Sequence, residues 1–195
     1  MNRKVNTTVL VEMAVLIAII VIMAFTPVGY IRTGALSITL IVIPVAVGAV
    51  VLGPRAGAVL GAVFGITSFI QCFGLEPFGT ALFGIKPFGT FVVCLLPRVL
   101  MGWLSGFIYV GFCKIKGTKG IAIFIGNLAA PILNTIFFMA SLVVIFRDYL
   151  TDQYAMKNIF SFVVAFVGIN GLIEAAVCFL VGSAISGALK KVLRQ

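Results

Sequence analysis

Two charged side chains stand within otherwise apolar stretches of this chain, and they are the residues best suited to do chemistry. Arg98 follows Pro97 within FVVCLLPRVLMGWL, and Glu174 lies within NGLIEAAVCFL. Asn134 and Asn170 add amide groups in similar surroundings. A charge at the centre of a bilayer costs about 2.5–3.5 kcal/mol on insertion scales, so such residues mark functional sites by default. Together these groups could bind a small polar solute.

Further polar side chains could join that site from the connecting segments. Tyr30 and Arg32 are the residues with substantial hydrogen-bonding side chains in segment 26–36, and Gln71 follows the third apolar run. Other interpretations stay open at this point. Tyr30 and Arg32 could lie at the membrane interface, the two central charges could pair with each other, and the asparagines could bridge helices.

Groups that support catalysis are scarce in this sequence. It has no histidine, which removes the commonest metal ligand and general base. Its four cysteines are far apart and form no C-x-x-C motif, so we interpret them as apolar packing residues. We find no nucleophile–base pairing, paired carboxylates or phosphate-binding glycine loop. The sequence therefore predicts neither an enzyme nor a metal or cofactor site.

The composition indicates that membrane helices position the polar groups. Hydrophobic residues make up 62% of the 195 residues and charged residues 10%, against about 45–50% and about 25% in soluble domains. Continuous apolar runs indicate helices, because backbone groups in lipid must be hydrogen-bonded internally. The net charge of +9 comes from Lys and Arg in short loops and tails. The positive-inside rule explains this pattern without a nucleic-acid partner.

We predict an all-α membrane protein, with residues 1–195 forming a single domain built as a six-helix bundle. The helices are expected near residues 9–25, 37–52, 55–70, 91–112, 120–146 and from 158 to the basic end. Pro44 is expected to kink the second helix. Segment 147–157 is the most polar stretch and is expected to form a loop.

The segment from Gln71 to Gly89 separates the third and fourth apolar runs. It reads QCFGLEPFGTALFGIKPFG, and with Thr90 it contains Pro-Phe-Gly-Thr twice. Glycine and proline disfavour a regular helix over the whole span, and long ordered loops often act as lids or binding loops. We predict a lid over the outer mouth of the bundle. A loop resting in the lipid headgroup region is the alternative.

The distribution of charge predicts the orientation of the bundle. With six helices both termini share one side, and that side holds Arg3, Lys4, Arg55, Lys114, Lys116, Lys119, Lys190, Lys191 and Arg194. The opposite side holds Arg32, Lys86, Arg147 and Lys157, together with Glu76, Asp148 and Asp152. The basic side is expected in the cytoplasm. The predicted lid then faces outward.

Small residues at every fourth position predict two helix faces suited to close packing. Ala14 and Ala18 share one face of the first helix, and Gly57, Gly61 and Gly65 share one face of the third. Such small-xxx-small patterns let a neighbouring helix approach closely.

The chain resembles the substrate-binding S components of energy-coupling factor (ECF) vitamin transporters over nearly its whole length. The motifs that carry the likeness are Ile43-Pro44 with Gly48-Ala49, Leu52-Gly53-Pro54-Arg55-Ala56-Gly57 and Gly61-Ala62-Val63-Phe64-Gly65. The pair Ala14-x-x-x-Ala18 is similar to a helix-one motif of the family, through which S components contact the coupling subunit.

The resemblance implies that the chain binds a vitamin or vitamin precursor at the outer side of the bacterial plasma membrane. It implies docking on a membrane coupling subunit (EcfT-like) with two cytosolic ATPases, and toppling in the lipid bilayer that carries the substrate inward. The expected docking residues are Ala14, Ala18, Gly57 and Gly61. The expected substrate-binding residues are Tyr30, Arg32, Gln71, Arg98, Asn134, Asn170 and Glu174.

Within the family, the chain looks most like the pantothenate branch. That likeness rests on Thr26-Pro27-Val28-Gly29-Tyr30, Pro97-Arg98, Leu133-Asn134-Thr135 and Asn170-Gly171-Leu172-Ile173-Glu174. It implies that Arg98 meets the vitamin's carboxylate, and that Asn and Glu side chains meet its hydroxyls and amide. Pyridoxine, hydroxymethylpyrimidine, folate and riboflavin remain alternative substrates. A self-sufficient small secondary transporter or channel remains the alternative from another class.

Overall fold

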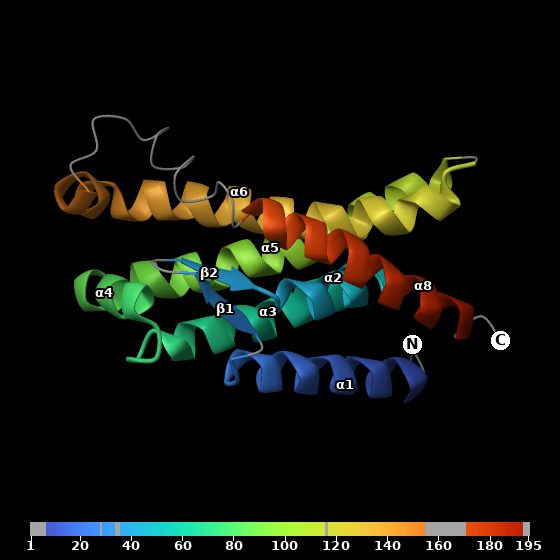
Figure 1. The fold of residues 1–195 in the computed structure, drawn as a ribbon, viewed down its shortest axis with the longest axis horizontal. Helices are drawn as coiled ribbons and strands as arrows, with labels where there is room; N and C mark the ends of the chain where they lie inside the picture. Colours follow the sequence, from blue (N-terminus) through green and yellow to red (C-terminus); the bar gives the residue numbers. More distant parts are fainter. Residues whose placement is uncertain (1–6, 28, 34–35, 116, 155–170, 193–195) are drawn as a thin grey trace, which may run out of the picture.

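The protein is an elongated bundle of helices, described by a computed structural model at residues 7–27, 29–33, 36–115, 117–154 and 171–192 (Figure 1). Its elements in order are α1 (Thr7–Ala24), β1 (Tyr30–Thr33), β2 (Leu36–Thr39), α2 (Val42–Val51), α3 (Pro54–Gln71), α4 (Pro77–Ile85), α5 (Pro87–Lys114) and α6 (Lys119–Tyr154). The last described helix, Gly171–Val192, contains a π-helical turn, η1 (Cys178–Gly182), and ends in α8 (Ser183–Val192).

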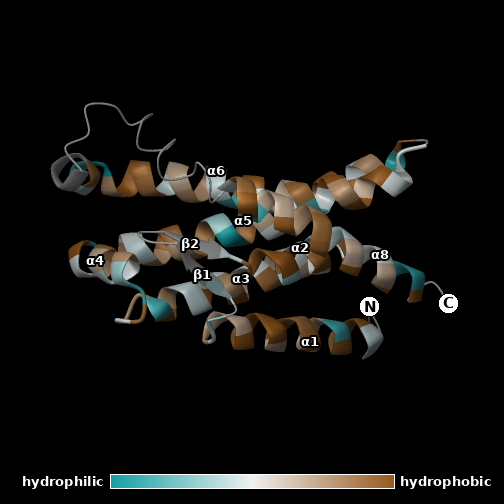
Figure 2. Ribbon diagram, in the orientation of Figure 1, coloured by the Kyte–Doolittle hydropathy of each residue, from teal (hydrophilic) through white to brown (hydrophobic). Residues whose placement is uncertain are grey.

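Four of the described helices are long and apolar enough to cross a membrane. They are Thr7–Ala24, Pro87–Lys114, Gly120–Leu150 and Gly171–Val192. Figure 2 shows hydrophobic residues along most of α1, and Leu10, Val11, Val15 and Ile22 are each more than half exposed there. Apolar side chains can face lipid tails without cost, and the helix satisfies its own backbone hydrogen bonds there. The exposed apolar surface of α1 therefore suits contact with lipid.

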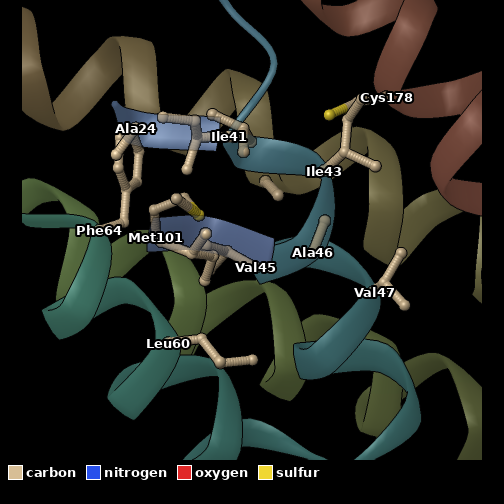
Figure 3. Close-up of a cluster of buried hydrophobic side chains, with 13 residues drawn as sticks. Ala24, Ile41, Ile43, Val45, Ala46, Val47, Leu60, Phe64, Met101 and Cys178 are labelled. Carbon is tan, nitrogen blue, oxygen red and sulfur yellow. The ribbon is translucent and has the colours of Figure 1, made fainter. Parts of the chain in front are cut away.

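Helix α2 forms the centre of the apolar core (Figure 3). Every residue from Val42 to Val50 is buried, and the cluster also takes in Phe64, Leu60 and Met101. The ten residues of α2 span only about 15 Å at the helical rise. Pro44 lies in its first turn, where proline is tolerated, so the predicted kink is absent because the helix starts later than expected.

A short β-hairpin takes the place of the predicted connecting loop and of the start of the second helix. Strands β1 and β2 pair antiparallel, with Tyr30 opposite Thr39 and Thr33 opposite Leu36. The prediction of helix is therefore wrong over residues 37–41, and the helix itself begins at Val42. The described fold is helical apart from this hairpin, which lies well away from the end of the bundle where α1 starts (Figure 1).

Helices α3 and α5 pack backbone to backbone through the predicted glycine face. A Cβ atom added at Gly65 would lie 2.8 Å from the Leu95 Cα, and one added at Gly61 or Gly57 would collide with an α5 carbonyl. This confirms close packing on that face. Gly57 and Gly61, which were predicted to dock a partner, are both buried against α5 inside the chain's own bundle. Ala14 and Ala18 remain exposed on α1.

The two Pro-Phe-Gly-Thr copies each start a helix, which the sequence analysis did not foresee. Pro77 and Pro87 occupy the first turns of α4 and α5, where a missing N–H costs no hydrogen bond. The hydroxyls of Thr80 and Thr90 donate to the carbonyls four residues earlier, at 2.8 and 3.1 Å. Residues 77–85 of the predicted lid loop therefore form helix α4, and α5 begins at Pro87.

Helix α6 also continues further than expected. It runs to Tyr154 through a kink at Phe146, whose φ and ψ are −115° and 25°. The prediction of a polar loop from Arg147 is wrong over residues 147–154, which are helical. The remainder of that predicted loop and the start of the last helix lie outside the described residues.

Candidate functional site

A cavity of about 180 Å³ lies among the hairpin, α3, α4, α5, α6 and the start of the last helix. One water needs about 10–15 Å³, whereas pockets for drug-sized ligands usually measure about 300–1,000 Å³. The cavity therefore suits a small organic solute. Of the residues predicted to form a site, it is lined by Tyr30, Gln71, Arg98, Asn134 and Glu174.

Arg98 brings a guanidinium group into the wall of this cavity. Its Nη1 donates to the Val93 carbonyl at 2.7 Å. Its Cζ lies 4.6 Å from the centroid of the Phe138 ring and 5.5 Å from that of Phe64. Two aromatic faces thus stabilise the cation and fix its plane. The buried Nε has no hydrogen-bond partner among the described residues, so this group has an unused donor.

Asn134 is the second polar side chain with an unused atom in the cavity wall. The residue is only 8% exposed, and its buried Oδ1 has no partner among the described residues. A buried amide oxygen left in this state costs about 1–3 kcal/mol. Because the side chain lines the cavity, a ligand with a donor group could satisfy it.

Glu174 connects the cavity to the hairpin. It is 8% exposed, and its Oε1 accepts a hydrogen bond from the Thr39 backbone N–H at 2.6 Å. This contact joins the last helix to the final residue of β2. The carboxylate therefore holds one wall of the cavity in place as well as lining it.

Tyr30 and Gln71 close the cavity on the side of α1 and α3. The Gln71 Nε2 donates to the Ala24 carbonyl at the end of α1. Burial raises the pKa of the Tyr30 phenol, while hydrogen bonding to Ser68 and the charge of Arg98 act in the opposite direction. The phenol therefore stays protonated and neutral at physiological pH.

The central charges do not neutralise each other directly. The Arg98 guanidinium donates to the Val93 carbonyl and the Glu174 carboxylate accepts from Thr39, and among the described residues no ion pair within 4.0 Å joins the two side chains. Each charge therefore faces the cavity separately. Two other predicted site residues cannot be placed in this way: Asn170 lies outside the described residues, and so does the side chain of Arg32.

Several cavity residues were not foreseen from the sequence. Cys72 and Cys94 line it, with their sulfur atoms 3.8 Å apart, although 22 positions separate them in the chain. Phe138 was not foreseen because its contact with Arg98 depends on the packing of α5 against α6. Thr39 contributes a backbone N–H, which no side-chain pattern could reveal.

Comparison with known proteins identifies the family. The family model described as "ECF transporter, substrate-specific component" matches residues 8–186. The chain belongs to this family. The resemblance noted from the sequence is thereby confirmed, and the chain is a component of a transporter and not an enzyme.

Two curated relatives resemble the chain at modest identity. The "Pantothenic acid transporter PanT" of Lactococcus lactis subsp. cremoris is 28% identical over 165 residues, covering 78% of this chain and 78% of the relative. The "Pantothenate transporter PanT" of Leuconostoc mesenteroides subsp. mesenteroides is 28% identical over 199 residues, covering 96% and 94%.

Proposed function

We propose that this chain is the pantothenate-binding S component of an ECF importer in the bacterial plasma membrane. The observation that carries the proposal is the Arg98 guanidinium, which lines the cavity and whose Nε has no partner among the described residues. A free cationic donor in a largely apolar bundle calls for an anionic ligand. Pantothenate has one carboxylate, and both relatives carry its name.

The remaining polar groups of the cavity match the rest of such a molecule. Pantothenate carries two hydroxyls and an amide beyond its carboxylate. The Asn134 Oδ1 can accept from a hydroxyl or an amide N–H, and Glu174 offers further acceptor capacity across the cavity. The apolar surfaces of Phe78, Leu82 and Met139, also in the wall, suit the vitamin's methyl groups.

The proposed orientation places the cavity toward the outside of the cell. The start of α1, the end of α8 and the α5–α6 turn lie at one end of the bundle (Figure 1), and Lys114, Lys190 and Lys191 belong to that end. The positive-inside rule assigns it to the cytoplasm. In this arrangement the chain crosses the membrane six times, through α1, the hairpin together with the short helix α2, α3, α5, α6 and the last helix, and α4 covers the outer mouth.

We propose that delivery then requires a separate coupling subunit and two ATPases. The exposed Ala14 and Ala18 on α1 offer a flat surface on which another membrane helix can pack. We propose that α1, and not the buried glycine face of α3, contacts the coupling subunit. Replacing both alanines with leucine is expected to abolish uptake and to leave vitamin binding unchanged.

The decisive test is calorimetric titration of the purified chain in detergent with pantothenate. Arg98→Ala should weaken binding about 10- to 100-fold, because a hydrogen bond to a charged group contributes about 1.5–3 kcal/mol. Arg98→Lys should recover only part of this loss, because lysine lacks the planar fork. Arg55→Ala, at the exposed start of α3, is the control and should bind normally. If Arg98→Ala bound pantothenate as tightly as the parent protein, Arg98 would not be the group that binds the carboxylate.

The same measurement separates the alternative functions. Arg98 and Glu174 both line the cavity and are not paired with each other. A ring that carries both donor and acceptor groups would also suit them, so pyridoxine is titrated as well. Tighter binding of pyridoxine than of pantothenate would reassign the substrate. Net uptake by the chain alone in liposomes, without ATPases, would instead favour a self-sufficient transporter.

A further inference from the structure

The cavity wall holds two thiols that the binding site proposed above does not use. The Sγ atoms of Cys72 and Cys94 lie 3.8 Å apart, both cysteines are buried, and both line the cavity. Cys72 follows the last residue of α3, and Cys94 lies within α5. The pair therefore joins the two helices at the place where they border the cavity.

We propose that Cys72 and Cys94 form a reactive dithiol site, which a small organic disulfide entering the cavity converts into a Cys72–Cys94 disulfide. One thiolate attacks the reagent, forms a mixed disulfide and releases one thiol. The second thiolate then attacks the protein sulfur of that mixed disulfide and releases the other thiol. The two cysteines lose two electrons and two protons in total, and the reagent becomes two thiols.

The geometry favours closure of this bond. The two sulfurs must approach by about 1.8 Å to reach a bond length of about 2.05 Å. Cys72 sits at the C-terminal cap of α3, ahead of a turn in which Gly74 has a φ of 111°. Movement at this position does not require an intact helix to bend. Cys94, by contrast, is fixed within α5.

The bridge would disturb the groups that the proposed function assigns to the vitamin. Cys72 directly follows Gln71, whose amide holds the end of α1. Cys94 follows Val93, whose carbonyl positions the Arg98 guanidinium at 2.7 Å. Drawing the two sulfurs together is therefore expected to move Gln71 and the Val93 carbonyl, and with that carbonyl the Arg98 guanidinium. We infer that the bridged protein binds the vitamin more weakly, and that bound vitamin shields the thiols.

The test for the dithiol uses a variant with Cys113→Ala and Cys178→Ala, which leaves only the cysteine pair. The folded protein is treated with 4,4′-dithiodipyridine and its intact mass is measured. The expected product is lighter by two hydrogens and retains no pyridylthio group. Adding Cys72→Ala or Cys94→Ala to this background should leave one pyridylthio group attached. Two retained groups in the parent variant, or no reaction until the protein is unfolded in SDS, would overturn the proposal.

The expected effect of bridging on vitamin binding rests on the proposed function, and it is tested separately by measuring pantothenate affinity. Saturating pantothenate should slow bridging, and the bridged protein should bind pantothenate at least about tenfold more weakly, since a lost hydrogen bond to a charged group is worth that much. Dithiothreitol should restore binding. Unchanged affinity after bridging would overturn this link. If the reduced protein bound no pantothenate at all, the proposed function would fail, while the mass measurement would still decide whether the dithiol exists.

Discussion

Helices α3 and α5 meet in two regions that differ in kind. Along Gly57, Gly61 and Gly65, their backbones touch and no side chain fits between them. Toward the C-terminal end of α3, the same two helices carry Gln71 and Arg98 into the wall of a cavity. The first region leaves no room for a side chain, whereas the second holds the Arg98 Nε, a buried donor with no partner among the described residues.

Arg98 belongs to both regions, which explains how they work together. Its carbonyl lies against Gly61, whereas its guanidinium lies between the rings of Phe64 and Phe138 at the cavity. The tight backbone contact fixes the position of a side chain that would be costly to hold in lipid. Precise placement of a binding group thus depends on dense packing beside it.

The largest expected effect comes from breaking the packed region at Gly61. Gly61→Ala places a methyl group against the Arg98 carbonyl, so the helices must separate. Overpacking of this kind costs about 1–3 kcal/mol, and we expect the melting temperature to fall by several degrees together with weaker ligand binding. Fluorescence-detected thermal unfolding and titration of the same preparation measure both effects.

Gly111→Ala is the matched control for this change, because Gly111 lies on α5 with no atom near its added Cβ. It should leave binding unchanged and slightly raise stability through helix propensity. Parent-like stability and affinity of Gly61→Ala would show that the packed region does not position Arg98.

A finer test compares two buried asparagines on α6. The Asn127 amide donates to the Ile123 carbonyl at 2.8 Å and to the Ser186 hydroxyl at 3.2 Å, whereas the Asn134 Oδ1 has no partner in the described part of the chain. Asn134→Leu should raise the melting temperature, since it removes an unsatisfied group worth about 1–3 kcal/mol, and should weaken ligand binding about tenfold.

Asn127→Leu should behave in the opposite way. It removes satisfied hydrogen bonds and leaves the buried Ser186 hydroxyl without this partner, so the melting temperature should fall while affinity stays near that of the parent. Unfolding and titration of both variants give the comparison. If Asn134→Leu destabilised the protein and kept full affinity, Asn134 would belong to the scaffold and not to the site.

The sequence predicted best those features for which exposing a polar or charged group to lipid would cost much free energy. Uninterrupted apolar runs predicted the positions of α1, α3, α5 and most of α6, because the bilayer demands continuous helices. The same reasoning singled out Arg98 and Glu174, since a charge in such a run is too costly to retain without a use. Both proved to line one cavity.

Features set by weaker or longer-range forces could not be predicted in this way. The hairpin from Tyr30 to Thr39 replaces a loop and part of a helix, and the Thr39 N–H at its end donates to Glu174, which lies 135 positions away in the chain. Proline was interpreted as a helix breaker at Pro77 and Pro87, although it is also favoured in the first turn. The Cys72–Cys94 contact joins positions that share no motif.

The smallest expected effect concerns the cap of α4, at the edge of the cavity region. The Glu76 carboxylate accepts from the Gly79 N–H and so satisfies the start of α4. Loss of a cap costs about 1 kcal/mol, which corresponds to roughly 2–4 °C in melting temperature for a chain of this size. Glu76→Ala should show this decrease.

Glu76→Ser is the informative partner of that variant, because serine removes the charge but can still cap the helix. If the cap orders α4 over the cavity, Glu76→Ser should melt above Glu76→Ala and bind the vitamin more tightly. Equal melting temperatures with equally reduced affinity would assign the role to the charge. The densely packed region should not respond in either case, since α4 contributes nothing to the glycine contact between α3 and α5.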